Sequence, residues 1–206
     1  MSGSARWTMG EAVAVLRRDR AFRPLLKAVG PIELRGHRPY FWTLCCAILA
    51  QQVSGAAART IINRVRDLYP ERRFPDPHSV LSTAAEKLRA AGVSRQKARY
   101  LHALAEAFDS GDLSNVRFAR LSDEEIMERL TAVVGIGRWT AEMFLMFSMR
   151  RRDVFPADDL GIKRGMERYF NVSGVEAMRE RAERWRPYRT IASVYIWRAL
   201  SAMPPT

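Results

Sequence analysis

The stretch that decides the fold is residues 130–169, LTAVVGIGRWTAEMFLMFSMRRRDVFPADDLGIKRGMERY. Near its start, Gly135-Ile136-Gly137 separates a segment ending at Val133-Val134 from one beginning at Arg138-Trp139-Thr140, both with apolar residues at helical spacing. Two glycines around one apolar residue permit a positive φ and a tight reversal. The first turn of the second helix would present unpaired backbone N–H groups at its positive dipole end, which suits an anion. Such a turn is also common where two helices merely pack, so both interpretations stay open.

A pair of carboxylates follows the hairpin. Phe155-Pro156-Ala157-Asp158-Asp159 leads into a predicted helix over residues 160–169. Aspartate is a preferred N-cap and is favourable in a first turn, which accounts for one of the two carboxylates. A second carboxylate, directed into a cleft of a strongly basic protein, would need a chemical reason.

Helix signals recur along the rest of the chain. Thr8-x-x-Glu11 and Ser122-x-x-Glu125 are capping boxes. The glycines that stand where helices would end are Gly30, Gly92 and Gly111. Convincing strand alternation is missing, so we expect an all-α fold of roughly ten short helices. The least helical stretch, residues 69–80, is either a crossing between two subdomains or a loop.

Charge and composition narrow the function without deciding it. The 206 residues carry 34 Lys+Arg against 22 Asp+Glu, a net charge of +12, and only four of the basic residues are lysine. Arginine forks match phosphate oxygens two at a time, so a polyanion partner is one explanation, and a genome that favours arginine is another. The longest apolar run, residues 40–50, is too short for a bilayer span. We therefore expect a cytoplasmic protein with no membrane association.

Four blocks of sequence carry a resemblance to a known family. Residues 47–54 (AILAQQVS), 134–141 (VGIGRWTA) and 155–159 (FPADD) occur in this order, followed by 184–189 (RWRPYR) with Ile196-Trp197. Together they resemble the helix-hairpin-helix (HhH-GPD) DNA glycosylases, and within them the alkylation-repair branch of 3-methyladenine DNA glycosylase II. The resemblance implies two helical lobes with a cleft between them that holds the lesion. One lobe would span about 38–150 with the hairpin at 134–137, and the other 1–37 plus 155–206.

The resemblance also implies what this chain lacks. Bifunctional relatives carry a lysine at the position of Trp139, so we expect a monofunctional enzyme without abasic-site lyase activity. Endonuclease III-type relatives hold an iron–sulfur cluster on four C-terminal cysteines, and no cysteine follows Cys46 here. We expect no cluster, no required cofactor, and no counterpart of the N-terminal α/β domain of the bacterial enzyme.

Asp159 is the catalytic carboxylate that the resemblance implies, with Asp158 as the helix cap. The residues expected to line the base pocket are Trp139, Trp197, Met143 and Leu160. The residues expected to contact DNA are Gln51, Gln52, Val53, Ser54, Gly135, Ile136, Gly137, Arg138, Thr140 and Lys163. By the same resemblance, Gln52 would fill the gap left by a flipped base, and the carbonyls of Thr131, Val133 and Ile136 would bind Na⁺ or K⁺.

Plainer roles compete at several of these positions. Tryptophan is more often a core residue than a site residue, Gln51 and Gln52 could simply end a helix before an N-cap at Ser54, and Arg138 and Lys163 could be solvated surface residues. The function that the resemblance implies is hydrolysis of the N-glycosidic bond of alkylated purines flipped from damaged double-stranded DNA, by a monomer. The alternatives are a glycosylase of the same fold for another lesion, such as hypoxanthine, 1-methyladenine, 3-methylcytosine or an oxidised purine, and a non-catalytic DNA-binding protein.

Overall fold

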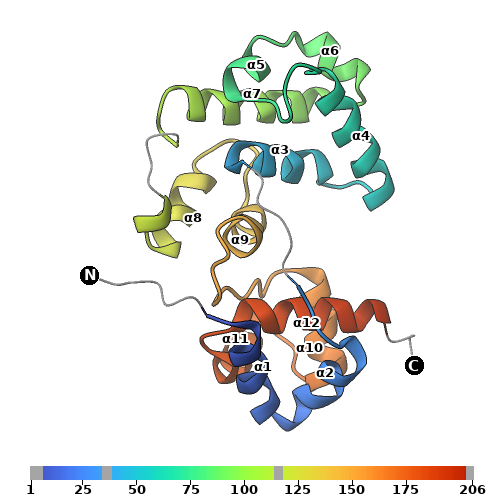
Figure 1. The fold of residues 1–206 in the computed structure, drawn as a ribbon, viewed down its shortest axis with the longest axis vertical. Helices are drawn as coiled ribbons and strands as arrows, with labels where there is room; N and C mark the ends of the chain where they lie inside the picture. The colour runs from blue at the N-terminus through green and yellow to red at the C-terminus, as the bar shows by residue number, and fades with distance from the viewer. Residues whose placement is uncertain (1–6, 34–38, 114–117, 203–206) are drawn as a thin grey trace. The chain divides into compact units, whose positions relative to one another are not determined.

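The chain is helical throughout the part that the structure describes. The computed structural model describes residues 7–33, 39–113 and 118–202, and within these ranges every regular element is a helix (Figure 1). The α-helices are α1 (Met9–Arg18), α2 (Arg23–Val29), α3 (Tyr40–Ala50), α4 (Gly55–Asp67), α5 (Pro77–Leu81), α6 (Ala85–Ala90), α7 (Arg95–Asp109), α8 (Asp123–Thr131), α9 (Arg138–Phe147), α10 (Leu160–Phe170), α11 (Val175–Ala182) and α12 (Arg189–Ala202). The 3₁₀ helices are η1 (Arg20–Phe22), η2 (Phe118–Arg120) and η3 (Glu183–Trp185). The all-α prediction is confirmed.

Local sequence signals place most helix ends. Thr8 and Ser122 both cap their helices through complete capping boxes, as predicted. Gly30 ends α2 with φ +70°, a left-handed conformation that glycine adopts without steric cost. Capping depends on residues three or four apart, which explains why the sequence predicts these boundaries well.

Two expectations about the helices were wrong in detail. The stretch over residues 69–80 is no crossing between subdomains, because Asp76 caps a short helix that begins at Pro77 within it. Together with α6, this helix raises the number of α-helices in the described ranges above the expected ten. The helix before the hairpin ends at Thr131 rather than at Val133-Val134, since Ile136 N–H already bonds to Val133 O in the turn.

The chain divides into two compact units. Unit 1 contains Met1–Arg35 and Arg150–Thr206, and unit 2 contains Gly36–Met149. The lobes expected from the sequence were 38–150 and 1–37 plus 155–206, so the expected boundaries differ by a few residues. Residue 38 itself lies outside the described ranges.

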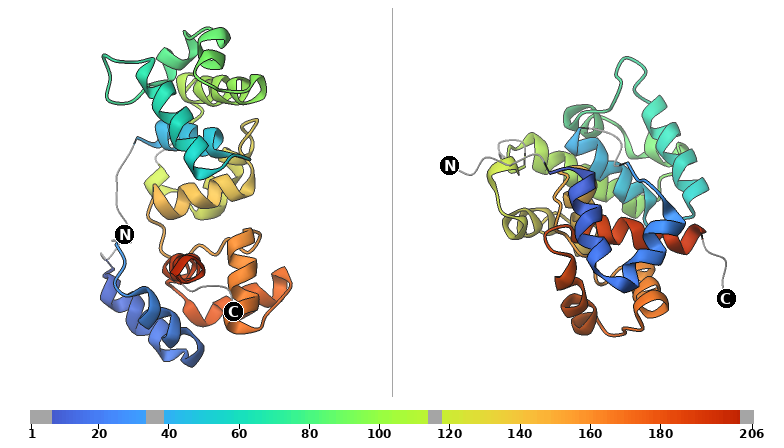
Figure 2. Two further views of the ribbon diagram at one scale, coloured as in Figure 1. Left: turned by 90° about the vertical axis from the view of Figure 1, so that its right-hand side faces the viewer. Right: turned by 60° about the horizontal axis from the view of Figure 1, so that its bottom comes forward.

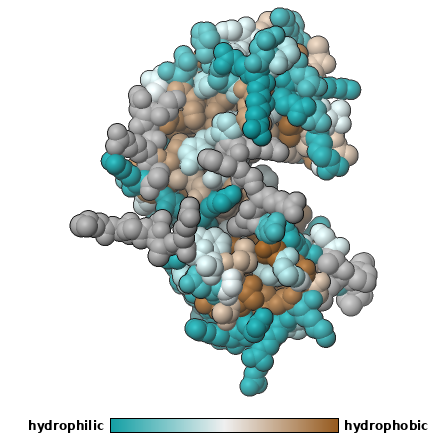
Figure 3. All heavy atoms as spheres, viewed as in Figure 1, coloured by the Kyte–Doolittle hydropathy of each residue, from teal (hydrophilic) through white to brown (hydrophobic). Residues whose placement is uncertain are grey.

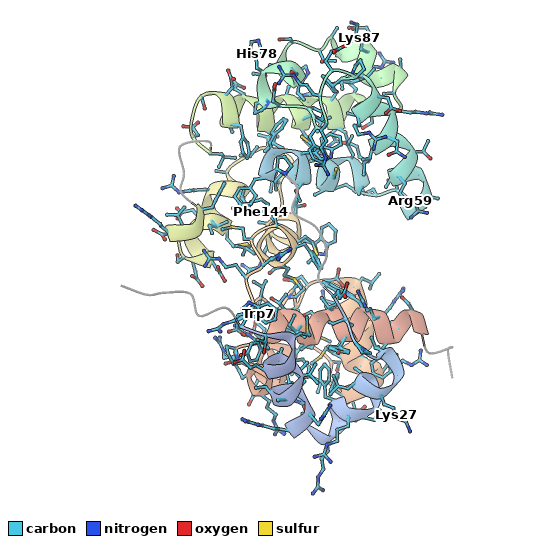
Figure 4. All side chains as sticks on the ribbon, viewed as in Figure 1. Trp7, Lys27, Arg59, His78, Lys87 and Phe144 are labelled. Atoms are coloured by element: carbon cyan, nitrogen blue, oxygen red, sulfur yellow. The ribbon has the colours of Figure 1, made fainter. Side chains whose placement is uncertain are left out.

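Unit 2 is built around α3. Six of its eleven residues are buried, and the helix packs against α4, α7 and α9. An α-helix that is apolar on all sides needs such a central position. Phe144 of α9, labelled in Figure 4, packs edge-to-face against Tyr40 at a centroid distance of 5.1 Å and against Phe118 at 5.5 Å. The hairpin at 135–137 is therefore attached to a well-packed core.

Unit 1 is built around α12. Figure 2 shows α12 nearly end-on in its left panel, with α1 and α2 on one side and α10 and α11 on the other. Phe22 packs against Trp185 at 5.1 Å between ring centroids, and Trp185 against Phe170 at 5.0 Å. The carboxylate of Asp19 accepts hydrogen bonds from Trp185 Nε1, at 2.9 Å, and from the guanidinium of Arg181. This partly buried ion pair ties the N-terminal helices to the C-terminal part of the chain.

Hydrophilic side chains cover much of the outer surface of each unit in the view of Figure 3. The side chains that extend furthest from each unit in this view are hydrophilic too. In the described ranges, no helix is both long and apolar enough to cross a membrane.

Candidate active site

Asp159 stands at the start of α10, where its side chain caps the helix. The turn before it is closed by Asp159 N–H donating to Pro156 O at 3.0 Å. Asp159 then has extended backbone angles, and its Oδ1 accepts from Ile162 N–H at 2.9 Å. The expectation that Asp158 caps this helix was wrong. An N-cap must directly precede the first helical residue, and the turn from Pro156 puts Asp159 in that place.

Trp197 of α12 holds the same carboxylate oxygen. Its indole Nε1 donates to Asp159 Oδ1 at 2.7 Å, so this oxygen accepts from both a backbone N–H and an indole N–H. Both donors are neutral, and they orient the carboxylate without cancelling its charge. Trp197 was expected as a wall of the base pocket, and the structure adds a contact to the catalytic candidate that sequence reasoning missed.

Glycines allow α10 and α12 to come close enough for this bond. A Cβ on Gly161 would lie 2.7 Å from Trp197 Cδ1 and 3.0 Å from Asp159 Oδ1. One turn later, a Cβ on Gly165 would lie 2.1 Å from Ile196 Cγ2. Real Cβ atoms do not approach other heavy atoms so closely, so both positions require glycine in this packing.

The segment before the Asp pair is anchored to α12 as well. Arg189 donates to both carboxylate oxygens of Asp153, at 2.8 Å from Nε and 3.1 Å from Nη2. The buried Thr190 hydroxyl donates to Arg151 O at 2.6 Å and accepts from Val154 N–H at 3.0 Å. Charge-assisted, bidentate bonds fix geometry well, so the chain entering the site is held at several points.

Asp158 has a different environment from its neighbour. Its side chain is half exposed and lies 3.5 Å from Lys163 Nζ and 3.9 Å from an Arg179 nitrogen. Exposed pairs of this kind contribute little to stability. Lys163, expected to contact phosphate, is thus already partnered by a carboxylate.

The hairpin has the shape that the sequence predicts. Gly135 has φ +92°, and a Cβ there would lie 2.2 Å from Tyr100 Cγ. Ile136 is buried, which leaves only its backbone for a ligand. Gly137 is the N-cap of α9, has no side-chain cap, and has open space where a Cβ would stand. The first N–H groups of α9 are therefore approachable by an anion.

Two side chains at the start of α9 are less available than expected. Thr140 is buried, so its side chain is not on the surface. Arg138 Nε donates to Glu142 Oε1 at 3.1 Å, although the arginine side chain stays 63% exposed. Both residues still contribute backbone N–H groups to the first turn of the helix.

The loop over residues 51–54 divides into fixed ends and an exposed tip. Gln51 caps the C-terminus of α3, and its side-chain Nε2 donates to Gly135 O at 3.0 Å, so this side chain holds the hairpin instead of facing solvent. Ser54 caps α4 by accepting from Ala57 N–H. Between them, Gln52 is exposed with φ +53° and Val53 is exposed.

The expected pocket residues fall on both units. Trp139 and Met143 belong to α9 of unit 2, with Trp139 42% exposed and Met143 half-buried. Leu160 and Trp197 belong to unit 1, where Leu160 is 61% exposed beside Asp159. Leu160 therefore presents apolar surface directly beside the Asp159 carboxylate.

The carbonyls expected to bind a monovalent cation lie where a cation is favourable. Thr131 is the last residue of α8, and Val133 and Ile136 follow in the hairpin. The C-terminal end of a helix carries the negative end of its dipole. Val133 O accepts one hydrogen bond, from Ile136 N–H at 3.0 Å, and a carbonyl oxygen has two lone pairs. These residues fit such an ion.

Two residues of α7 contact this region and were missed from the sequence. Lys97 Nζ donates to Leu49 O at 2.8 Å and to Gln51 O at 2.7 Å, and the Tyr100 ring lies against Gly135. A signal was present, because Lys97 is four residues before the buried Leu101 and seven before the buried Leu104. A lysine on an otherwise apolar helix face calls for a buried acceptor.

Comparison with known proteins identifies the family. Residues 45–188 match the family described as HhH-GPD superfamily base excision DNA repair proteins. The chain belongs to this superfamily. Among its relatives, DNA-3-methyladenine glycosylase 1 of Schizosaccharomyces pombe is 37% identical over 187 residues, covering 87% of this chain and 82% of the relative.

Two solved structures of the superfamily resemble this fold closely. A 3-methyladenine DNA glycosylase of Schizosaccharomyces pombe, in complex with abasic DNA, has a TM-score of 0.80 at 35% identity and covers 91% of this chain and 95% of its own. A DNA-3-methyladenine glycosidase of Bacillus halodurans has a TM-score of 0.81 at 32% identity and covers 92% and 88%.

Proposed function

We propose that the protein is a monofunctional DNA glycosylase that hydrolyses the N-glycosidic bond of alkylated purines, of the 3-methyladenine and 7-methylguanine type, flipped from duplex DNA. The observation that carries this proposal is the bond from Trp197 Nε1 to Asp159 Oδ1 at 2.7 Å, which orients a carboxylate at a helix start beside an exposed apolar side chain. The relatives with 3-methyladenine glycosylase activity in their names support the substrate class.

The chemistry needs little more than an oriented negative charge. Alkylation at a purine ring nitrogen makes the base cationic and a good leaving group. As the bond from the anomeric carbon to the base nitrogen breaks, its electron pair leaves with the base, and positive charge develops on the sugar. A carboxylate about 4 Å away, at an effective dielectric of about 20, attracts that charge by roughly 4 kcal/mol before geometry and hydration are discounted.

Water completes the reaction. Its oxygen bonds to the anomeric carbon, and its proton passes to the Asp159 carboxylate, which then releases it to solvent. The products are the free base and an abasic site. Trp139 carries no amine, so the residue at that position cannot form a Schiff base with the sugar, and we propose that the enzyme has no lyase activity.

DNA would be held by backbone groups more than by side chains. The open N-terminus of α9 at Gly137 would bind a phosphate next to the lesion. A Na⁺ or K⁺ ion held by the carbonyls of Thr131, Val133 and Ile136 would add positive charge against the same phosphate. Base flipping costs a few kcal/mol for unstacking, and the exposed Gln52 tip would fill the vacated space.

The cationic base would be held by aromatic faces. A ring quadrupole attracts a cation placed over its face, and Trp139 and Trp197 supply such rings. Met143, four residues after Trp139, and Leu160, next to Asp159 in the sequence, are aliphatic. We therefore propose that the enzyme accepts more than one alkylated base.

The test compares two adjacent carboxylates. Asp159→Asn should abolish base release from alkylated duplex DNA and leave affinity for that duplex unchanged. Asp158→Asn is the matched control, because it removes the same charge one residue away and should keep release close to wild type. Base release by Asp159→Asn at the wild-type rate would refute the assignment, and loss in Asp158→Asn alone would mean that the other carboxylate reacts.

A further inference from the structure

The C-terminal end of α3 receives its positive charge from another helix. The last turn of α3 contains no basic residue, and its C-cap Gln51 has left the helical conformation with ψ 135°. The last carbonyls of a helix lack partners within it and carry the negative end of the dipole. Lys97 of α7 meets this need by donating to Leu49 O and Gln51 O, at 2.8 and 2.7 Å.

Lys97 is placed for this contact at a cost. Its side chain is half-buried, and burial lowers its pKa. A lysine ammonium leaves water only where acceptors replace the lost hydration. The carbonyls of Leu49 and Gln51 replace that hydration, so the ammonium is held at the C-terminal end of α3.

The residue that follows this contact is in an unusual conformation. Gln52 has φ +53°, and the left-handed region costs a non-glycine residue roughly 1 kcal/mol or more. Such a conformation persists only when the surrounding structure holds it. Lys97 fixes the carbonyl just before Gln52, and the Ser54 cap fixes the chain just after the tip.

A second residue of α7 sets the position of the hairpin. Tyr100 lies one turn after Lys97, and its ring occupies the place that a Cβ on Gly135 would need, 2.2 Å from Cγ. The Tyr100 hydroxyl accepts a hydrogen bond from Gln96 Nε2 at 2.6 Å, which holds the ring. Gln51 connects the Lys97 contact to the hairpin, because its backbone O accepts from Lys97 and its side-chain Nε2 donates to Gly135 O at 3.0 Å.

These three side chains form one connected support, which we name the α7 brace: Lys97, Tyr100 and Gln51. It links α7, the loop at Gln52 and the hairpin at 135–137, which are far apart in the sequence and lie in one compact unit. Whether such a connected set of contacts couples the two loops is measured by a double-mutant cycle.

We propose that Lys97 is a positioning residue for lesion recognition, which through the α7 brace holds the Gln52 tip and the phosphate-binding hairpin as one rigid surface. This inference rests on the proposed function, in which the tip enters the DNA stack while the hairpin binds a phosphate. A loop already ordered in its bound conformation loses less entropy on binding than a mobile one. Undamaged duplex does not admit the Gln52 tip into its stack, so it gains less from this ordering.

The experiment measures affinity for two duplexes, one with a tetrahydrofuran abasic analogue and one undamaged. Lys97→Met removes the ammonium and keeps most of the side-chain stem. We expect it to lower affinity for the abasic-analogue duplex about tenfold, in line with the loss of hydrogen bonds from a charged group, and to change affinity for the undamaged duplex less than twofold. Lys97→Arg, which keeps a cationic donor, should lose less than Lys97→Met.

A matched control separates position from charge. Lys87 is an exposed lysine on α6, labelled in Figure 4, and Lys87→Met removes the same charge from the same unit. It should leave the preference for the abasic analogue unchanged. Equal losses on both duplexes for Lys97→Met, or no loss, would overturn the inference and leave Lys97 as a general source of charge.

A fluorescent base reports on the tip directly. 2-Aminopurine beside the abasic analogue changes its emission when the neighbouring stack is disturbed, and we expect a smaller change with Lys97→Met than with wild type at saturating protein. An unaltered signal would contradict the inference even if affinity falls. A general loss of packing would instead be seen as a lower melting temperature.

Gln51→Met reaches the α7 brace without removing a buried cation, so it keeps the inference testable if Lys97→Met folds poorly. It should reduce the same preference, and the double variant should lose no more than the worse single variant, because both act through one unit. Additive losses would overturn the claim of a single unit. If wild type releases no base from alkylated duplex DNA, the proposed function fails. If wild type releases base and prefers the abasic analogue, and both variants keep that preference, only this inference fails.

Discussion

Trp197 Nε1 donates a hydrogen bond to Asp159 Oδ1 at 2.7 Å, across 38 residues of sequence. The bond brings together the last long helix and the start of α10. The ring nitrogen orients the carboxylate, and we propose in addition that the ring offers a face to the cationic base. A helix cap alone would orient the carboxylate with one donor, and the indole adds the second.

Trp197→Phe separates these two uses. Phenylalanine keeps an aromatic face and lacks the N–H donor, so base release should slow about tenfold, as expected for a lost hydrogen bond to a charged group. Single-turnover release of base from alkylated duplex measures this rate. An unchanged rate would show that the helix N-terminus alone orients the carboxylate. Trp185→Phe cannot serve as the control, because Trp185 Nε1 donates a hydrogen bond to Asp19.

Gly161→Ala perturbs the same bond sterically. The new Cβ would lie 2.7 Å from Trp197 Cδ1 and 3.0 Å from Asp159 Oδ1, so the indole must move. Base release should fall by about tenfold or more. The steric clash should also lower the unfolding free energy, and the higher helix propensity of alanine, about 1 kcal/mol, should offset part of that loss. The rate of base release checks the first effect, and thermal denaturation checks the effect on stability. Wild-type release would mean that the indole shifts without consequence.

Substituting the two hairpin glycines should impair different properties, stability for Gly135 and DNA affinity for Gly137. Gly135→Ala strains a residue at φ +92° and drives a methyl group into Tyr100, so we expect a loss of about 3 kcal/mol of unfolding free energy. Gly137→Ala meets no atom within 4 Å, so the fold should be unaffected, but the methyl group would stand before the N–H groups at the start of α9. Its affinity for duplex DNA should fall about tenfold. Denaturant titration and DNA binding distinguish the two, and a Gly137→Ala protein with full affinity would argue against a phosphate at this helix.

Acid should weaken unit 1 through Asp19. Burial alone would raise the pKa of Asp19, but hydrogen bonds from Trp185 and Arg181 outweigh it and lower the pKa below 3.8. The unfolded chain therefore binds this proton at a higher pH than the folded chain does, and the unfolding free energy falls as the pH drops below about 3.8.

Asp19→Asn tests that assignment. The variant leaves Arg181 without its carboxylate partner, so it should lose about 3 kcal/mol of unfolding free energy at neutral pH. Below pH 3.8 the difference from wild type should narrow, because wild type loses the contribution that the variant already lacks. Denaturant unfolding across this pH range measures it. A constant difference would mean that Asp19 is not the titrating group.

The sequence by itself determined the helices and the hairpin. Capping boxes at Thr8 and Ser122 depend on residues three apart, and such contacts form wherever the local sequence specifies them. Gly135 predicts the reversal because a φ of +92° is a conformation that glycine adopts without steric cost. The four blocks that resemble the family are likewise short and local.

Only the tertiary structure decided which groups meet across the chain. The indole that bonds to the Asp159 carboxylate lies 38 residues away on α12. The Gln51 side chain, expected at the DNA, reaches Gly135 across 84 residues, and Lys97 reaches the end of α3. These contacts depend on how helices pack, which periodicity constrains only to a face of each helix, so spacing in the sequence cannot identify the partner.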